Sequence, residues 1–139
     1  MNYLLDTNVC IALMNGNPAS VRARVEKEIR AGARLFVSSI SLYELWYGVA
    51  KRSRDVAANT GKLQAFLAGP VAVLSFSEED SPLAGEVRAA TERAGKPIGS
   101  YDLLLAAQAL RRKLILVTAN AREFSRLAGL KWQNWTVSR

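Results

Sequence analysis

Two kinds of segment alternate along this chain, and each has its own pattern of apolar positions. Short runs that are apolar throughout are typical of strands buried on both faces of a parallel sheet. Longer runs with apolar residues three or four positions apart are typical of helices with one buried side. The continuous runs predict strands at residues 2–6, 35–37, 71–76 and 114–118, with a fifth at 130–135 on the edge of the sheet.

The helical pattern occupies the intervals between these strands. It predicts helices at residues 9–14, between Pro18 and Gly32, from Ser39 or Ser41 to Lys51, from the acidic start at 77–80 to Gly95, and from a capping Ser100 to Arg112. Residues 51–61 are polar and predict a connection between two helices. Strands that alternate with helices over short connections predict an α/β sandwich with a mainly parallel sheet. In such a sheet the functional site lies at the carboxyl ends of the strands.

Composition adds a basic character to this picture. The chain has 139 residues, of which 50% are hydrophobic, and a formal net charge of +7, so we expect one compact domain with an anionic partner such as nucleic acid. The lone Cys10 stands among apolar neighbours and is expected to be buried, and no intrachain disulfide can form. No apolar run approaches the ~20 residues that span a bilayer. We therefore expect a soluble cytoplasmic protein with no membrane contact.

The sequence contains no histidine. Its absence excludes Ser-His-Asp and Cys-His nucleophiles, nucleases that use a histidine pair, and zinc sites with histidine ligands. If the protein is an enzyme, carboxylates or lysines must therefore carry its chemistry.

Three carboxylates stand in unusually apolar surroundings, namely Asp6, Glu44 and Asp102. Each has a structural alternative. Asp6 could cap the following helix, Ser41-x-x-Glu44 matches a capping box, and Asp102 suits the positive end of a helix dipole. All three nevertheless map to the end of a strand or to the first turn of the next helix, so they can converge above one edge of the sheet.

Clustered carboxylates repel one another, which makes such a site reasonable mainly when a divalent cation lies within it. Magnesium prefers hard oxygen ligands and completes its coordination with waters and substrate phosphate. An acidic cluster inside a basic protein suits a phosphodiester hydrolase, because Arg and Lys hold the polyanion while metal ions neutralise the scissile phosphate.

Four segments, in order along the chain, carry a recognisable set of motifs. They are Leu4-Leu5-Asp6-Thr7-Asn8, Ser39-x-Ser41-x-x-Glu44-Leu45-x-x-Gly48, Gly95-Lys96-Pro97-Ile98-Gly99-Ser100-Tyr101-Asp102-x-Leu104-x-Ala106-Ala107, and Leu116-Val117-Thr118-x-Asn120-x-x-Glu123-Phe124. Together they resemble the motifs of PIN-domain ribonucleases, especially the VapC toxins of type II toxin–antitoxin pairs. The resemblance covers the whole chain and implies a single PIN domain over residues 1–139, a PIN-like α/β/α sandwich with four to five strands.

The resemblance also implies roles for individual residues. Asp6, Glu44 and Asp102 would be the catalytic metal ligands, with Glu123 and Asn120 as further ligands. Thr7 and Thr118 would orient these ligands or a water molecule. The expected cofactor is Mg2+, with Mn2+ as a substitute. The fourth motif departs from many PIN domains, which have an aspartate where this chain has Asn120.

The implied activity is that of an endoribonuclease toxin that cuts a structured RNA, a tRNA or rRNA loop, and so inhibits translation. A cognate VapB-type antitoxin would neutralise it, and the protein would form a homodimer and a heteromeric complex with that antitoxin. We expect phosphate contacts from four basic residues, Lys51, Arg52, Arg54 and Lys96. Helical geometry lets only some of the apolar residues around Glu44 point into a single core, so others remain at the surface. We therefore expect an antitoxin helix beside Leu42 and Trp46, unless Trp46 belongs to the core.

Three other classes stay open on the sequence alone. The first is a PIN-like protein that binds RNA without cutting it. The second is a phosphatase with an aspartyl nucleophile, although that class needs a second aspartate where this chain has Asn8. The third is a basic adaptor protein without an active site. Metal-dependent cleavage of a labelled RNA pool would separate these classes.

Overall fold

The computed structural model describes residues 1–52 and 54–137, and within them five strands form a single sheet that is parallel throughout. The strands are β1 (Asn2–Leu5), β2 (Arg34–Ser38), β3 (Val71–Leu74), β4 (Ile115–Val117) and β5 (Trp132–Gln133). Their order in the sheet is β3-β2-β1-β4-β5, so the first strand is central and the last lies on an edge. The predicted parallel sheet and the edge position of the fifth strand are confirmed.

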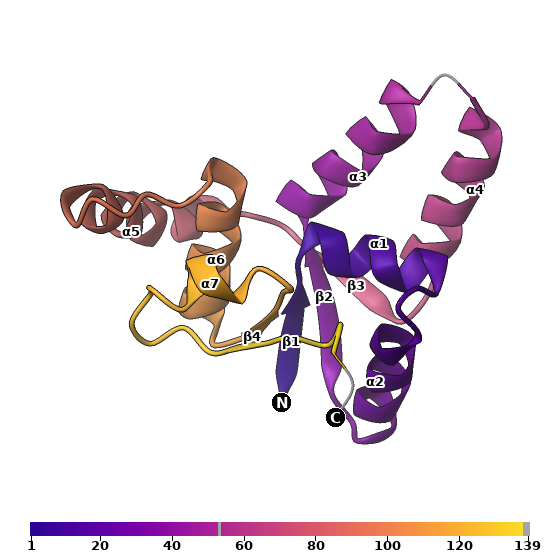
Figure 1. Ribbon diagram of the computed structural model, residues 1–139, viewed down its shortest axis with the longest axis horizontal. Coiled ribbons are helices and arrows are strands. Elements are labelled where there is room, and N and C mark those ends of the chain that lie inside the picture. Colours follow the sequence, from indigo (N-terminus) through magenta and orange to yellow (C-terminus); the bar gives the residue numbers. More distant parts are fainter. Residues whose placement is uncertain (53, 138–139) are drawn as a thin grey trace.

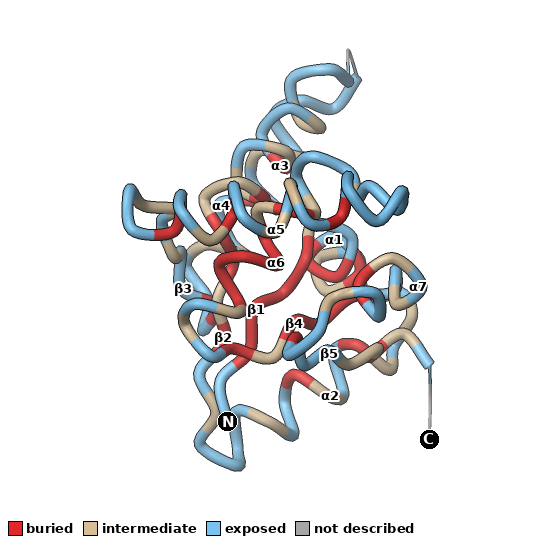
Figure 2. The backbone as a smooth tube through the Cα atoms, turned by 90° about the vertical axis from the view of Figure 1, so that its left-hand side faces the viewer, coloured by how far each residue is buried: buried red, intermediate tan, exposed pale blue. Residues whose placement is uncertain are grey.

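Helices cover both faces of the sheet (Figure 1). They are α1 (Thr7–Asn15), α2 (Ala19–Arg30), α3 (Ser39–Lys51), α4 (Val56–Leu67), α5 (Ser81–Arg93), α6 (Ser100–Arg112) and α7 (Ala121–Phe124), with a 3-10 turn η1 (Glu78–Asp80) before α5. Alternate residues of β1 point to opposite cores, because Tyr3 and Leu5 pack with α1, α2 and α4 whereas Leu4 packs with α6 and α7. This is the predicted α/β/α sandwich, and Figure 2 shows the central strand β1 as part of its buried centre.

Helix α3 begins at Ser39, as predicted, whereas two other helix starts differ from the sequence prediction. Ser38 caps α3, since its hydroxyl accepts a hydrogen bond from the Ile40 N–H at 3.1 Å. Ser41 is a buried residue within the helix, so the possible Ser41–Glu44 capping box is wrong. Gly99 precedes α6 and Ser100 is its first residue rather than its cap. Helix α4 begins at Val56, inside the segment predicted as a connection, and buries Leu63.

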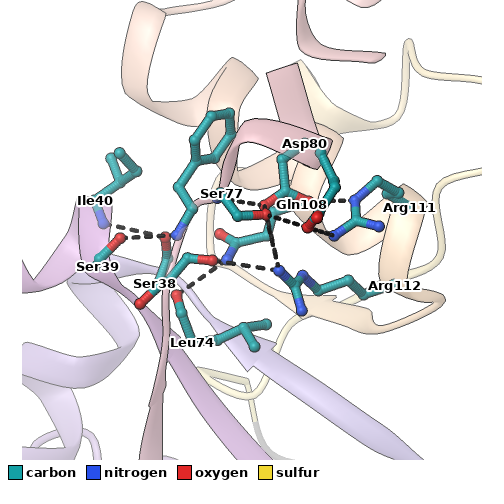
Figure 3. Close-up of polar contacts among 12 residues, drawn as sticks. Ser38, Ser39, Ile40, Leu74, Ser77, Asp80, Gln108, Arg111 and Arg112 are labelled. Carbon is teal, nitrogen blue, oxygen red and sulfur yellow. Dashed lines mark hydrogen bonds and ion pairs between the residues drawn. The ribbon is translucent and has the colours of Figure 1, made fainter. Parts of the chain in front are cut away.

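Asp80, in the acidic helix start predicted at 77–80, is fully buried. Its carboxylate accepts a hydrogen bond from the Ser77 N–H at 2.8 Å and pairs with Arg111 at 2.5 Å and Arg112 at 3.4 Å (Figure 3). Gln108 donates to the Leu74 carbonyl at 3.0 Å beside it. These contacts fasten the carboxyl end of α6 to the segment that follows β3, and so fix the helix whose other end carries Asp102.

Two expectations drawn from composition can be compared with the structure. Cys10 is fully buried, as predicted, and burial raises the pKa of its thiol far above the usual value. Of the helices in the described part of the chain, none is long and apolar enough to cross a membrane.

Candidate active site

Asp6 lies at the carboxyl end of β1, in the middle of the sheet. Its N–H donates to the Val117 carbonyl of β4 at 3.0 Å, and its carboxylate caps α1 by accepting the Val9 N–H at 2.9 Å. The side chain is 6% exposed. The capping role foreseen as an alternative is therefore real, but it occupies one oxygen of the carboxylate and leaves the other for further contacts.

Glu44 reaches the same region from α3, which rises from the carboxyl end of β2 (Figure 1). The hydroxyl of Thr7 donates a hydrogen bond to the Glu44 carboxylate at 2.8 Å. This bond joins the first residue of α1 to α3 and holds Glu44 toward Asp6. It agrees with the orienting role that the resemblance implies for Thr7.

Asp102, Asn120 and Glu123 form the other side of the site. The Asn120 amide nitrogen donates to Glu123 at 2.6 Å and to Asp102 at 3.4 Å. Glu123 also accepts the Gly99 N–H at 2.7 Å, which ties α7 to the start of α6. Because both carboxylates can only accept, the Asn120 nitrogen rather than its oxygen faces them.

The ionisation of the carboxylates shows how closely they are grouped. Burial raises the pKa of Asp6, and the Glu44 charge adds to this, while hydrogen bonds from Thr118 and the Val9 N–H act in the opposite direction. The pKa of Asp102 is raised to about 6, first by burial and then by the negative charges of Glu123, Asp6 and Glu44. Each shift is the expected result of like charges crowded into a partly dry pocket. The structure thus brings together four carboxylates from different elements at one edge of the sheet.

Thr118 and the predicted surface residues take up different positions. Thr118 is buried beneath the site, where its hydroxyl accepts the Asn120 N–H at 2.9 Å and hydrogen-bonds to Asp6.

Four basic residues are exposed, at the far end of α3 and in the α5–α6 connection: Lys51, Arg52, Arg54 and Lys96. Trp46 is 38% exposed on α3 and Leu42 is half-buried, so Trp46 is not a core residue.

The sequence analysis missed two features of this region. The Gly99 N–H holds Glu123, and a backbone donor leaves no trace in residue type. Tyr43 and Tyr101 each precede a site carboxylate, and their rings meet edge to face at 5.8 Å between centroids. A hydrogen bond to Tyr43 is the largest cause that raises the pKa of Tyr101, and the Glu44 charge contributes. The repeated Tyr-acid pairs at 43–44 and 101–102 were the available signal.

Comparison with known families gives a match over most of the chain. Residues 3–130 match the PIN domain. The chain belongs to the PIN domain family. The family and the fold class predicted from the sequence are therefore confirmed, whereas the extent of a single domain over residues 1–139 stays a prediction.

Curated relatives within the PIN family carry more specific names. A "tRNA(fMet)-specific endonuclease VapC" from Shigella flexneri is 36% identical over 98% of this chain and 99% of the relative. A "Ribonuclease VapC2" from Rickettsia felis is 38% identical over 97% of this chain and 98% of the relative. These relatives confirm the predicted enzyme class, a ribonuclease of VapC type.

Solved structures place the PIN fold in toxin–antitoxin complexes. VapBC2 from Rickettsia felis, bound to a DNA fragment from its promoter, superposes with a TM-score of 0.89 at 37% identity, covering 97% of this chain and 99% of that one. VapBC-1 from nontypeable Haemophilus influenzae superposes with a TM-score of 0.87 at 33% identity, over 99% of this chain and all of that one. Both contain the antitoxin partner that the sequence led us to expect for this chain.

The chemistry of the site fits the divalent metal ions that PIN-domain nucleases use. The four acids that meet here are carboxylates, the hard oxygen donors that magnesium and manganese favour. Within residues 1–52 and 54–137, no three Asp, Glu or Cys side chains surround one point closely enough to hold an ion. The Asn120 amide nitrogen donates to both Asp102 and Glu123 in this arrangement.

Proposed function

We propose that this PIN-family ribonuclease is a magnesium-dependent toxin that cuts a structured RNA and so inhibits translation, and that an antitoxin of the VapB type neutralises it. One observation supports the site above all others, namely the convergence of Asp6, Glu44, Asp102 and Glu123 in a protein of net charge +7. The name of the Shigella relative suggests tRNA(fMet) as the first substrate to test.

In this proposal Asp6, Glu44 and Asp102 hold the metal and Glu123 completes the set. Bound there, a divalent ion supplies charge that neutralises the scissile phosphate and makes water more acidic. Asp6 is fixed by the Val9 N–H and by Thr118, while Thr7 fixes Glu44. These hydrogen bonds aim the carboxylates before the substrate arrives, which lowers the reorganisation needed during the reaction.

The side-chain amide of Asn120 and the backbone amide of Gly99 hold Glu123 in place. Their N–H groups both donate to Glu123, so this carboxylate is oriented from two sides. The amide oxygen of Asn120 can reach a metal only after the side chain turns over. Its role as a ligand stays a prediction, and its present geometry supports a positioning role.

A direct experiment is incubation of the purified protein with a labelled RNA pool, with magnesium, with manganese, and with a chelator. We expect cleavage with magnesium and none with the chelator, and no hydrolysis of a small phosphate ester. Binding of RNA without cleavage would favour a non-catalytic PIN-like protein, and ester hydrolysis would favour a phosphatase. Mapping RNA ends after brief expression in cells would then identify the substrate, with tRNA(fMet) tested directly.

Magnesium should stabilise the protein in proportion to its binding. A hundredfold excess over Kd adds about 2.7 kcal/mol to the free energy of unfolding, because the ion binds only the folded state. Asp102→Asn should gain much less, since it removes one ligand from the shared site. Thermal melts with and without magnesium test this, and equal shifts in both proteins would contradict a shared ion site.

Antitoxin binding should depend on Trp46. This side chain is 38% exposed on the helix that carries Glu44, and large exposed aromatic side chains are typical of protein interfaces. We propose that an antitoxin helix packs beside Trp46 and Leu42 and that a basic residue of its tail reaches the carboxylates. Trp46→Ala should then weaken antitoxin binding by at least ~2 kcal/mol, while free toxin still cleaves RNA.

Titration of the variant with its cognate antitoxin measures this effect. Trp132→Ala is a matched control, because Trp132 is 37% exposed on the edge strand β5. Undiminished affinity of Trp46→Ala would place the antitoxin groove elsewhere.

A further inference from the structure

Two tyrosines stand at the rim of the site, one on each of the helices that supply Glu44 and Asp102. Tyr43 and Tyr101 are 55% and 43% exposed, and their rings meet edge to face at 5.8 Å. The contact bridges α3 and α6 directly beside the carboxylates. Neither ring contributes to a buried core, so packing alone does not explain why two aromatic side chains lie here.

The aromatic surface continues along α3. Tyr47 lies four residues after Tyr43 and is 57% exposed, and residues at this spacing occupy the same helix face, with Cβ atoms about 5–6 Å apart. The Lys51 ammonium group, four residues further on, lies 5.6 Å from the centre of the Tyr47 ring. We call Tyr101, Tyr43 and Tyr47 the aromatic track. It starts beside the carboxylates and ends at a cation.

We propose that the aromatic track stacks unpaired bases of the RNA that flank the cleavage point, with Lys51 holding a phosphate at its outer end. This inference rests on the proposed ribonuclease function and describes how the same site would bind its RNA substrate. Aromatic rings on a surface with a cation alongside are the usual means of holding single-stranded nucleic acid, because every base has a face that can stack.

The charges around the track favour RNA as its occupant. The negative charges of Glu44 and Asp102 repel the phosphate backbone of RNA until a metal ion neutralises them. Contacts that bind RNA close to these carboxylates are therefore best made by uncharged side chains. Tyrosine rings that stack on RNA bases supply such contacts. Lys51 lies about seven residues or 10 Å along α3 from Glu44, where its charge can attract phosphate at the outer end of the track.

The test is binding of a short labelled single-stranded RNA of mixed sequence in the Asp102→Asn background, which keeps the RNA intact. Tyr43→Ala and Tyr101→Ala should each weaken binding about tenfold, the scale of one lost stacking contact, while Tyr43→Phe and Tyr101→Phe bind within about twofold of the parent. Trp132→Ala, a change of similar exposure on β5, should bind like the parent. Alanine variants should keep the parent melting temperature, because both side chains are exposed.

An RNA of the same length with abasic positions separates stacking from other causes. The parent protein should bind it more weakly than intact RNA, and the alanine variants should lose nothing further. Equal losses on intact and abasic RNA, phenylalanine variants as weak as alanine ones, or unchanged binding would each overturn the proposal. So would alanine variants that bind RNA normally but lose affinity for antitoxin, because the track would then be a protein surface.

Cleavage by proteins that retain Asp102 distinguishes this inference from the proposed function. If the wild-type protein cuts no RNA with any metal, the proposed function fails, and the binding comparison still decides whether the track stacks bases. If it cuts RNA, Tyr43→Ala and Tyr101→Ala should raise KM about tenfold with little change in kcat, since stacking contributes equally to the ground and transition states. A fall in kcat at constant KM would overturn a role in substrate binding.

Discussion

RNA cleavage should fall by about a thousandfold or more when Asp102 is replaced by Asn, a loss on the scale seen for single electrostatic groups in active sites. Asp6→Ala and Glu44→Ala should behave in the same way, because each removes a negative charge from the proposed metal site. The measurement is the rate of metal-dependent cleavage at saturating magnesium. Glu86→Gln, which alters an exposed carboxylate on α5, is the matched control and should cleave like the wild-type protein. Wild-type cleavage by Asp6→Ala would show that the site is wrongly assigned.

The same substitution should leave the metal-free protein at least as stable. The pKa of Asp102 is about 6 in the folded protein, above its ordinary value of 3.8, so the folded state holds this proton more tightly than the unfolded state. The contribution of Asp102 to stability is then fully present below pH 4 and falls as pH rises through 6, by an amount on the order of 3 kcal/mol at most. Asp102→Asn should lack this fall. A pH series of metal-free melts in which both proteins lose the same stability would contradict the electrostatic picture.

The sequence was sufficient for the fold because its signals were local. Every predicted strand is present, and the strand at 2–6 lies centrally where its unbroken apolar run required burial on both faces. The placement of Asp6 and Asp102 also followed from local rules, since a carboxylate that follows a strand or begins a helix in a parallel sheet is carried to one edge. That is why three residues far apart in sequence could be grouped before their positions were known.

The features that the sequence did not reveal depend on partners far along the chain. Asp80 lies in an acidic helix start with no basic neighbour close in sequence, and the return of α6 brings Arg111 and Arg112 to it. The turn at Gly99 matters through a backbone N–H that any residue could supply. Helix α4 has a weak pattern because its polar residues face outward and Leu63 alone is fully buried, so residues 56–61 resembled a connection.

Replacing Asp80 by Asn should lower the free energy of unfolding by about 3 kcal/mol, the cost of breaking a buried ion pair by changing one partner. Burial alone would raise the pKa of Asp80, but the Ser77 N–H and the guanidinium groups of Arg111 and Arg112 outweigh it and hold that pKa below its ordinary value. Its stabilising effect is therefore present above pH 4 and lost as pH falls further, the reverse of Asp102. Chemical denaturation at neutral pH measures the loss.

Asp80→Asn and Asp102→Asn form a matched pair. The same isosteric change is made at Asp102, in the first turn of α6, and at Asp80 of η1, which pairs with the last two residues of α6. At neutral pH without metal the first should destabilise the protein, since it leaves two arginines without their counter-charge. The second should not, since it relieves repulsion among carboxylates. Asp80→Asn should still cleave RNA at temperatures where it is folded, because Asp80 contacts α6 at the end away from the site. Equal denaturation midpoints for Asp80→Asn and the wild-type protein would show that this ion pair contributes nothing to stability.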